Sequence, residues 1–438
     1  MRISPGKRIT VRLVATLGLA YVLSQFLRSS NAVLAPELAA DLDLLPDSLG
    51  VLTGAYFFAF ALVQIPVGIL LDRYGSRWVV AVMLGFAVAG CLVFADAENL
   101  RDLIIGRALM GLGCASILMG ALLVYARWFP TERFATFTAI QLAIGNTGIL
   151  LATSPLAAAV EGFGWRSSIG AVGLYALIIA GLILLLIKDA PPDHPVHSRP
   201  PESLAQSLKG VGAILRSREL WPLLPLLCTG YASVASISAL WGGPYLADVH
   251  GLAIQERGTV LLAMAVGSIV GSMAFAPLDR AFRTRKKVVL WGAAINIVAF
   301  VMLALVDGPP LIMVGVLFVS LSAGVGYMAV LTAHARVIYP EHLVGRGMTV
   351  ANMGNMMGVA TLQSVTGAVI ALSAGTGNQP GEGDYRLVFA LLAVVLIIAT
   401  LCYLKARDIP PGREQEMPAR RIYSAAETAT SSRSRSGK

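Results

Sequence analysis

The chain has 438 residues, of which 56% are hydrophobic and only 13% are charged, and its mean hydropathy is +0.72. Soluble domains carry about a quarter charged residues, so this composition excludes a soluble enzyme and indicates a membrane protein. The net charge of +9 does not indicate nucleic-acid binding, because the basic residues lie in short segments between apolar runs rather than on one soluble face.

Apolar segments recur along nearly the whole chain, and each approaches or exceeds the roughly 20 residues that a helix needs to cross a bilayer. They predict twelve transmembrane helices, at residues 10–37, 48–71, 78–96, 101–127, 133–160, 167–188, 220–247, 255–278, 287–306, 310–337, 346–373 and 385–406. The connection 189–219 is rich in Pro, Ser and charge, which is typical of a linker. We therefore expect an all-α polytopic protein with a six-helix bundle over 1–188, a cytoplasmic linker over 189–219, a second six-helix bundle over 220–406 and a disordered tail over 407–438.

Lysine and arginine are distributed unevenly over the connections between these segments. If the N-terminus lies inside, the outer connections hold only Arg101, Arg166, Arg257 and Arg386 out of 34 basic residues. Basic residues gather in the cytoplasmic connections of membrane proteins. Both termini are therefore expected in the cytoplasm, and we expect a multi-pass protein of a bacterial inner membrane.

The first segment contains a charged side chain, Arg28, inside the stretch "LSQFLRSSNAVLAPEL". Tyr21, Ser24, Arg28 and Asn31 follow spacings of three, four and three, so they share one helix face, which is expected to line a wet cavity. A charge inside the membrane costs at least about 3 kcal/mol, and its retention implies a partner. The alternative is that the long arginine side chain bends toward the outer headgroups.

The connection after the second segment reads "GILLDRYGSRWVV" at 68–80. A short connection needs Gly75 for the turn and Gly68 for the close approach of a neighbouring helix, and the alternative is a generic positive cytoplasmic loop. The stretch resembles the signature of the major facilitator superfamily at Gly68, Leu70, Asp72, Arg73, Gly75 and Arg77. The resemblance implies a gating loop that latches two six-helix halves together when a carrier is open to the outside.

A second intramembrane arginine, Arg107, lies in the fourth segment, "DLIIGRALMGLGCA", which resembles the fourth-helix pattern of the same family. The alternative for Arg107 is a structural bond to carbonyls or polar groups of a neighbouring helix. No Asp or Glu lies deep in a segment, so we expect the substrate to supply the missing negative charge. Guanidinium groups suit carboxylates and phosphates because their donors match two oxygens at once.

Arginines in the first and fourth segments also resemble the anion:cation symporter branch of the superfamily, in which two such arginines bind or organise an organic anion. The protonatable acids of that branch are missing, since Leu27 precedes Arg28 and Cys114 stands at the fourth-segment position. A looser resemblance, in "PVGILLDRYGSR" and "LWGGPYL", is to bacterial relatives of lysosomal dipeptide carriers. A peptide amine would want an acidic partner, and the sequence offers none.

The second half of the chain repeats features of the first at nearly one offset. Three pairs recur: Asp72-Arg73 as Asp279-Arg280, Ala126-Arg127 as Ala335-Arg336, and Gly145-Asn146 as Gly354-Asn355. A parallel repeat of two six-helix bundles is an architecture in which substrate binds between the halves near the midplane. By resemblance, Asp279 and Arg280 belong to a second gating loop.

The seventh segment carries Tyr231, Ser238, Trp241 and Tyr245 on one face and is expected to loosen at "WGGPY", where Pro244 lacks an N–H. We expect Trp241 and Tyr245 to line the cavity beside an outer hinge, and the alternative is a packing stripe. Asn355 and Gln363 are candidates for neutral hydrogen bonds to substrate or between helices. His334 is either a proton site or an interfacial packing residue.

These features predict a secondary active transporter of a small organic anion, a carboxylate or a phosphate ester, that works by alternating access. The alternatives are efflux of drug-like or siderophore-like compounds, dipeptide transport, and a transporter-shaped sensor or assembly factor. No enzymatic, metal or cofactor site is expected, because the four cysteines have no CxxC spacing and the glycines of "GLGCASILMG" follow no strand. The expected partners are the substrate and the bilayer, the chain is expected to be a monomer, and the coupling ion and direction stay open.

Overall fold

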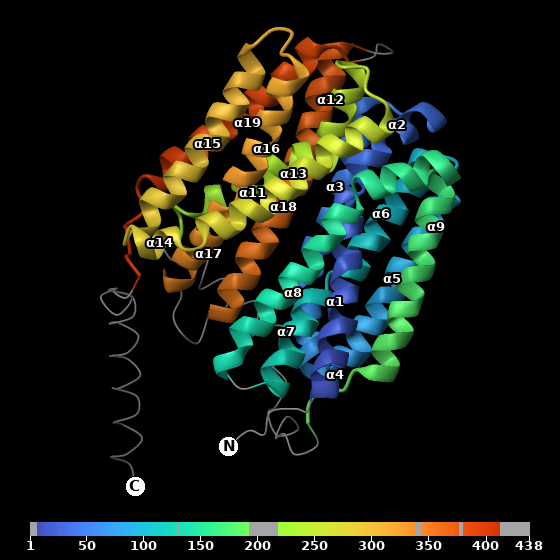
Figure 1. The fold of residues 1–438 in the computed structure, drawn as a ribbon, viewed down its shortest axis with the longest axis vertical. Helices are drawn as coiled ribbons and strands as arrows, with labels where there is room; N and C mark the ends of the chain where they lie inside the picture. The colour runs from blue at the N-terminus through green and yellow to red at the C-terminus, as the bar shows by residue number, and fades with distance from the viewer. Residues whose placement is uncertain (1–6, 130, 192–217, 339–343, 376–379, 412–438) are drawn as a thin grey trace.

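The computed structural model of the chain describes residues 7–129, 131–191, 218–338, 344–375 and 380–411 (Figure 1). Within these ranges every regular element is helical. Helices suit a membrane because each one satisfies its own backbone hydrogen bonds where no water is available. The predicted linker over 189–219 and tail over 407–438 lie largely outside the described residues.

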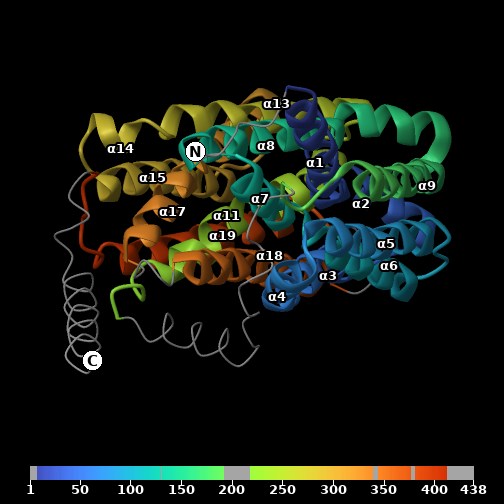
Figure 2. The same cartoon turned by 90° about the horizontal axis from the view of Figure 1, so that it is seen from below.

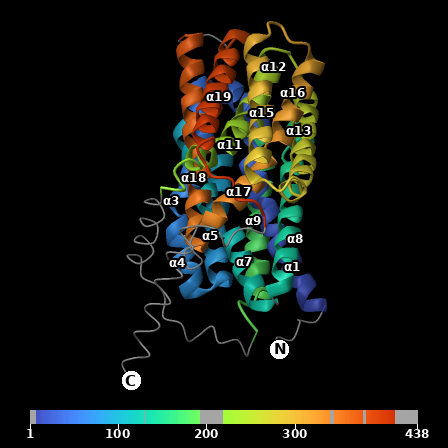
Figure 3. The same ribbon diagram turned by 90° about the vertical axis from the view of Figure 1, so that its left-hand side faces the viewer.

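The first half of the chain folds into helices that pack on one another along the long axis of the molecule (Figures 1 and 3). They are α1 (Lys7–Ser29), α2 (Asn31–Leu42), α3 (Pro46–Leu62), α4 (Gln64–Tyr74), α5 (Ser76–Ala95), α6 (Leu100–Cys114), α7 (Ile117–Trp128), α8 (Thr131–Leu151) and α9 (Ser154–Leu186). The last of these turns at Gly164, whose φ of 77° is open to glycine and strained for other residues.

The second half of the chain forms its own group of helices, in yellow to red in Figure 2, beside the blue and green first half. They are α11 (Leu224–Ser236), the π-helix η2 (Ile237–Trp241), α12 (Gly242–Asp248), α13 (Ile254–Phe275), α14 (Leu278–Ala281), α15 (Arg285–Leu305), α16 (Leu311–Gly324), α17 (Tyr327–Ile338), α18 (Val344–Ala374) and α19 (Glu382–Tyr403).

The number of membrane spans can be compared with these helices. By length and hydropathy, ten helices in the described ranges could each cross a membrane. The bent pair Ser48–Leu62 and Gln64–Leu71 would add an eleventh, and Thr136–Leu151 is a shorter apolar helix. Twelve spans and cytoplasmic termini stay predictions.

Several predicted segments are interrupted. The first breaks at Ser30 into α1 and α2, and the second breaks at Val63 into α3 and α4, with a bend of 42°. The second break has a direct cause, because Pro66 lacks the N–H that would bond the carbonyl of Leu62. The predicted segments 10–37 and 48–71 are therefore each divided into two helices.

The seventh segment is irregular where its sequence predicted loosening. The chain passes from α11 through the five-residue π-helix η2 into α12, whose third residue is Pro244. Pro244 cannot donate to the carbonyl of Leu240, so the regular ladder is interrupted there. The loosening is confirmed as a widened turn, of the kind that is frequent at functional sites, whereas hinge motion stays a prediction.

The two halves share a repeated helix cap. Asp189, just after α9, accepts a hydrogen bond from the backbone N–H of Arg77 at the start of α5, at 2.9 Å. Asp408, just after α19, accepts hydrogen bonds from the backbone N–H groups of Arg285 and Lys286 at the start of α15, at 3.2 and 3.1 Å. Each carboxylate lies against the partial positive charge of a helix N-terminus, so the repeat extends beyond the matched sequence pairs.

Close glycine packing is repeated in the same way. A Cβ at Gly148 of α8 would lie 2.1 Å from the carbonyl oxygen of Val22 on α1. A Cβ at Gly358 of α18 would lie 1.8 Å from the carbonyl oxygen of Cys228 on α11. Small residues thus let the corresponding helix pair of each half approach at backbone distance, as is common between membrane helices.

The halves meet toward one end of the molecule, which we call the distal end, where α2 and α12 lie (Figure 1). They also meet along α3 and α18, where a Cβ at Gly50 would lie 2.4 Å from the carbonyl oxygen of Gln363. There Arg257 of α13 pairs with Glu37 of α2 at 2.8 Å, and Gln255 of α13 donates to Glu161 of α9 at 2.8 Å. At the other end, the proximal end, where α1 begins and α19 ends, the halves diverge in Figure 1. Among the described residues, α7 and α17 at this end make no comparable contact across the halves.

Candidate functional site

Arg28 lies near the end of α1 and is half-buried, whereas most residues around it are fully buried. Its guanidinium carbon lies 5.2 Å from the centre of the Phe60 ring on α3. Among the described residues no carboxylate pairs with it, and its buried Nε has no hydrogen-bond partner. The groups near enough to interact with its charge are neutral: Tyr21, Tyr56, Tyr231 and Cys114.

Arg107 of α6 has a different environment, although the sequence placed it beside Arg28 as a second substrate residue. It is 1% exposed. Its Nη1 donates to the carbonyl oxygen of Leu27 at 2.8 Å, and its guanidinium carbon lies 5.0 Å from the centre of the Tyr56 ring. The bond to Leu27 matches the alternative interpretation, a bond that ties α6 to the carbonyl just before Arg28. The Nε and Nη2 atoms of Arg107 are buried without a hydrogen-bond partner, so a contact with a substrate stays a prediction for this residue too.

The two arginines are linked through aromatic rings of α3. Tyr56 and Phe60 are one helical turn apart and stack at 6.3 Å with an interplanar angle of 22°. Arg28 lies over Phe60 and Arg107 lies over Tyr56, which gives an arginine–aromatic stack of four residues. A cation over an aromatic face gains about 0.5 to 2 kcal/mol, which is less than the cost of leaving its charge in a membrane.

Sequence reasoning missed Tyr56 and Phe60. The signal was present in "YFFAF", since an aromatic pair at i and i+4 shares one helix face. An apolar stripe in a membrane helix usually faces lipid or core, however, and nothing in the sequence placed this face against Arg28.

The other three members of the predicted polar face are used for packing between helices. Tyr21 lies so close to α8 that a Cβ at Gly145 would be 1.9 Å from its ring. The carbonyl of Ser24 accepts from the Tyr56 hydroxyl at 3.3 Å, and the Asn31 amide donates to Thr53. The regular ladder is interrupted at Ser30, so Asn31 begins α2, but Ser30 keeps helical dihedrals with φ −63° and ψ −25°. The expectation that Asn31 shares a face with Tyr21, Ser24 and Arg28 stays a prediction.

Trp241 and Tyr245 of the seventh segment contact side chains of the second half. Trp241 donates from its indole Nε1 to the Thr366 hydroxyl on α18 at 2.8 Å. Tyr245 packs against Tyr385 and Phe389 of α19, with ring centres 5.3 Å from each. Trp241 and Tyr245 are both 1% exposed, so in this conformation they match the packing alternative.

Two amides from α18 keep unused acceptors. Asn355 is half-buried, and its buried Oδ1 has no hydrogen-bond partner. Gln363 is fully buried, its Nε2 reaches the carbonyl of Ala235 only at 3.5 Å, and its Oε1 has no partner. Both stay candidates for neutral contacts with a substrate.

The first gating loop is organised around Gly75, whose φ is 80°. A Cβ there would lie 2.4 Å from the Asp189 carboxylate, so glycine is needed for the cap at Arg77. The guanidinium of Arg73 lies over Tyr74 and that of Arg77 over Trp78, at 5.3 and 5.5 Å. The side chain of Asp72 lies outside the described part of the structure.

Two expectations for the gating loops are changed by the structure. Nothing lies within 4 Å of a Cβ built at Gly68, so the expected close approach of a helix is wrong for this conformation. In the second loop, Asp279 is 8% exposed and its Oδ2 lies 3.6 Å from Nε of Arg285, while Arg280 is exposed. The charge of Asp279 is therefore engaged within its own half.

His334 of α17 is fully buried between two fixed partners. Its ring nitrogens lie 2.8 Å from the Tyr403 hydroxyl and 3.0 Å from the carbonyl oxygen of Arg407. A neutral ring satisfies both, by accepting from the hydroxyl and donating to the carbonyl. This placement matches the packing alternative.

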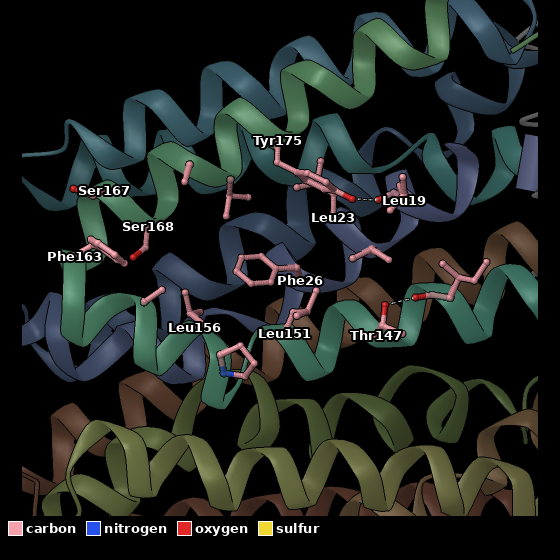
Figure 4. Close-up of a pocket in the computed structure, with 16 residues that line it drawn as sticks. Leu19, Leu23, Phe26, Thr147, Leu151, Leu156, Phe163, Ser167, Ser168 and Tyr175 are labelled. Atoms are coloured by element: carbon pink, nitrogen blue, oxygen red, sulfur yellow. Dashed lines mark hydrogen bonds between the residues drawn. The ribbon is translucent and has the colours of Figure 1, made fainter. Parts of the chain in front are cut away.

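A pocket of about 900 Å³ opens between α1, α8 and α9 (Figure 4). Phe26, Leu151 and Phe163 are among its apolar lining residues, and Arg28 is not. Three of its hydroxyls are already used (Figure 4): Tyr175 donates to the Leu19 carbonyl at 3.0 Å, Thr147 to that of Ile144 at 2.7 Å and Ser168 to that of Gly164 at 2.8 Å. The pocket contains no charged side chain to attract an anion. No cluster of metal-ligating side chains occurs in the described ranges.

A family model matches almost the whole chain. The model, described as Major Facilitator Superfamily, matches residues 17–283 and 235–434. Among curated relatives, the nitrate/nitrite transporter NrtP of Picosynechococcus is 30% identical over 191 residues, which cover 37% of this chain and 34% of that protein. The probable galactarate/D-glucarate transporter GudP of Bacillus subtilis is 25% identical over 296 residues, which cover 61% of this chain and 64% of that protein.

A solved structure shares the fold. The bacterial homologue of the human lysosomal transporter Spinster, in an inward-facing and occupied conformation, superposes with a TM-score of 0.72. The match covers 92% of this chain and 97% of that one at 18% sequence identity. The helical arrangement in Figure 1 is therefore one that a solved membrane transporter also adopts.

Proposed function

This chain belongs to the major facilitator superfamily and is a transporter rather than an enzyme, and from this premise we propose that it moves a small organic anion by alternating access. The substrate class that we favour is a carboxylate or a phosphate ester. Arg28 binds its negative charge, and Arg107 positions α1 through the carbonyl of Leu27. Asn355 and Gln363 supply neutral hydrogen bonds from the opposite half.

The observation that carries the proposal is the unpaired state of Arg28. An intramembrane arginine costs at least about 3 kcal/mol without compensation, and the Phe60 ring offsets only part of that. Among the described residues no acid pairs with it, so an anion that arrives with its own charge is the missing partner. A guanidinium binds two carboxylate oxygens at once.

Two relatives support the choice of an anion. NrtP is named for nitrate and nitrite, and GudP for galactarate and D-glucarate, all of which are anions. A cationic or zwitterionic substrate would bring an amine to a site whose fixed charge is positive. Repulsion between like charges at short range disfavours such substrates.

The distal contacts support alternating access around this site. We assign the distal end to the outside and the proximal end to the cytoplasm, as the distribution of basic residues predicts. The structure is then closed to the outside, and the gating loop at Gly75 would engage the second half only when the proximal end closes. We also propose that the chain is a monomer in a bacterial inner membrane.

Uptake into proteoliposomes tests the proposal. Purified protein should take up labelled D-glucarate or nitrate saturably. Arg28→Ala should reduce uptake at least about 100-fold, because a charge-assisted bidentate contact and the charge complement are both lost. Arg28→Lys should retain part of the activity, since lysine keeps the charge without the two-donor geometry.

The matched control is Arg101→Ala, which removes an exposed arginine at the distal end of α6 and should leave uptake unchanged. Wild-type rates in Arg28→Ala would rule out the anion assignment. Protection of cells against cationic or neutral toxins, without anion uptake, would favour the efflux alternative instead.

A further inference from the structure

We propose that this carrier exchanges one anion for another and does not return empty. The inference rests on the proposed function, because it concerns what neutralises Arg28 while the halves change over. Its physical basis is that, among the residues that the structure describes, no acidic group pairs with Arg28 and could replace the substrate's charge.

The acidic residues that follow Arg28 most closely in the chain, Glu37 and Asp41 of α2, are paired with Arg257 and Arg166. α1, α11 and α18 contain no Asp or Glu, α3 has one only in its first turn, at Asp47, and α6 has one only at Asp102, in its first turn. Asp102 is bound locally, since its backbone N–H and its carboxylate both bond to Asn99.

The groups near the Arg28 guanidinium carry no negative charge at neutral pH. They are the Phe60 ring, the hydroxyls of Tyr21, Tyr56 and Tyr231, and the thiol of Cys114. Phenols and thiols are protonated at neutral pH. No proton that binds or leaves in the physiological range can therefore switch the charge of this site on or off.

Arg28 also differs from Arg107 in what moves around it. Arg107 bonds to Leu27 and lies over Tyr56, both in its own half, so its surroundings travel with it as the halves rock. Arg28 interacts with Tyr231 of α11, in the opposite half. Its surroundings must rearrange whenever the carrier changes over.

These facts set different barriers for the loaded and the empty carrier. During the changeover the site is closed on both sides and loses bulk water, so a bare guanidinium is disfavoured while a guanidinium–anion pair is not. At the known cost of an unpaired intramembrane arginine, the empty carrier should change over roughly 100-fold more slowly than the loaded one. Each anion that enters must then be followed by an anion that leaves, with no net charge and no proton transferred.

Transport across liposomes distinguishes exchange from net uptake. Vesicles containing purified wild-type protein receive external labelled D-glucarate or nitrate, with valinomycin and potassium present to remove any limiting voltage. Initial uptake should be at least about 10-fold faster when the vesicles contain the same unlabelled anion than when they contain only zwitterionic buffer. An imposed pH gradient should change neither rate.

Equal uptake with and without internal anion would overturn the exchange proposal while leaving the anion assignment intact. Uptake that requires an inward proton gradient would overturn it as well. No anion uptake under either condition would refute the proposed function itself, and the exchange inference with it.

A second measurement needs no transport and observes the empty carrier directly. Dyes at positions 163 and 259, both exposed near the distal end of different halves, report opening and closing by single-molecule energy transfer. Empty wild type should switch rarely, and adding nitrate or D-glucarate should raise its switching rate by about 100-fold. Arg28→Gln should switch fast without any anion and ignore its addition, and Arg101→Gln should behave as wild type. Equal switching rates for empty wild type and empty Arg28→Gln would contradict the proposal.

Discussion

Two intramembrane arginines, both found from the sequence, differ in what the fold does with their charge. Arg107 is 1% exposed and donates to a backbone carbonyl, while Arg28 stays half-buried with only an aromatic ring against its charge. The difference arises because α6 places Arg107 against the end of α1, where Leu27 precedes the helix break at Ser30. We therefore assign a structural role to Arg107, which keeps two unbonded nitrogens, and propose Arg28 as the residue that binds the anion.

The structural role of Arg107 predicts a loss of stability. Arg107→Ala removes a charged hydrogen bond and leaves a cavity under Tyr56, so the free energy of unfolding should fall by about 3 kcal/mol. Anion affinity of the folded fraction should change only a few-fold. Thermal unfolding in detergent measures the first quantity and equilibrium binding the second. A variant of wild-type stability that no longer binds anions would instead assign Arg107 to the substrate site.

At this scale the sequence identified the charges but not their partners. The sequence alone showed that no Asp or Glu lies deep in an apolar segment, because the position of each acid relative to the segments is known. The choice between substrate binding and structural bonding was not, since it depends on whether a given helix face meets a carbonyl, a ring or a cavity. Tyr56 and Phe60 were missed for the same reason.

At the scale of helices, the contact between α2 and α12 is one of several that close the distal end. Pro36 lacks the N–H that would bond the carbonyl of Ala32 within α2. Gly243 of α12 lies directly against this carbonyl, and a Cβ on Gly243 would be only 1.8 Å from the carbonyl oxygen of Ala32. The two halves therefore approach at backbone distance because one side has proline and the other has glycine.

This contact predicts a conformational effect of Gly243→Ala. The added methyl meets backbone, which cannot move aside, so distal closure should be disfavoured by about 2 kcal/mol, or roughly 30-fold in population. Spin labels at positions 163 and 259 should then report a longer distance between the halves. Gly315→Ala is the matched control, because nothing lies within 4 Å of a Cβ there. An unchanged distance distribution in Gly243→Ala would show that this contact does not set distal closure.

The sequence predicted where the helical segments lie but not all of the points at which they are interrupted. The apolar runs located the segments, but a run gives no sign of a bend unless a proline or glycine lies in it. Pro66 explains the bend at Val63 and was present in the sequence, as was the glycine-proline pair before Tyr245. The break at Ser30 has no such residue, and only the packing around Asn31 and Thr53 identifies it.

At the scale of the whole molecule, the repeat was readable from three short sequence pairs and extends further in the structure. The caps at Asp189 and Asp408 and the glycine contacts at Gly148 and Gly358 occupy corresponding places in the two halves. The sequence could not predict that the distal end is closed in this structure, because one carrier sequence must adopt several arrangements of its two halves. The distal ion pair of Arg257 with Glu37 belongs to one of them.

The most direct test of the central claim is a thermal-shift titration of purified wild type and Arg28→Ala with nitrate and D-glucarate, with Arg101→Ala as the matched control. Ligand at about 100 times its dissociation constant should stabilise wild type and Arg101→Ala by about 2.7 kcal/mol, with no stabilisation of Arg28→Ala. An equal anion-dependent shift in Arg28→Ala and wild type would contradict the claim that Arg28 is the residue that receives the anion.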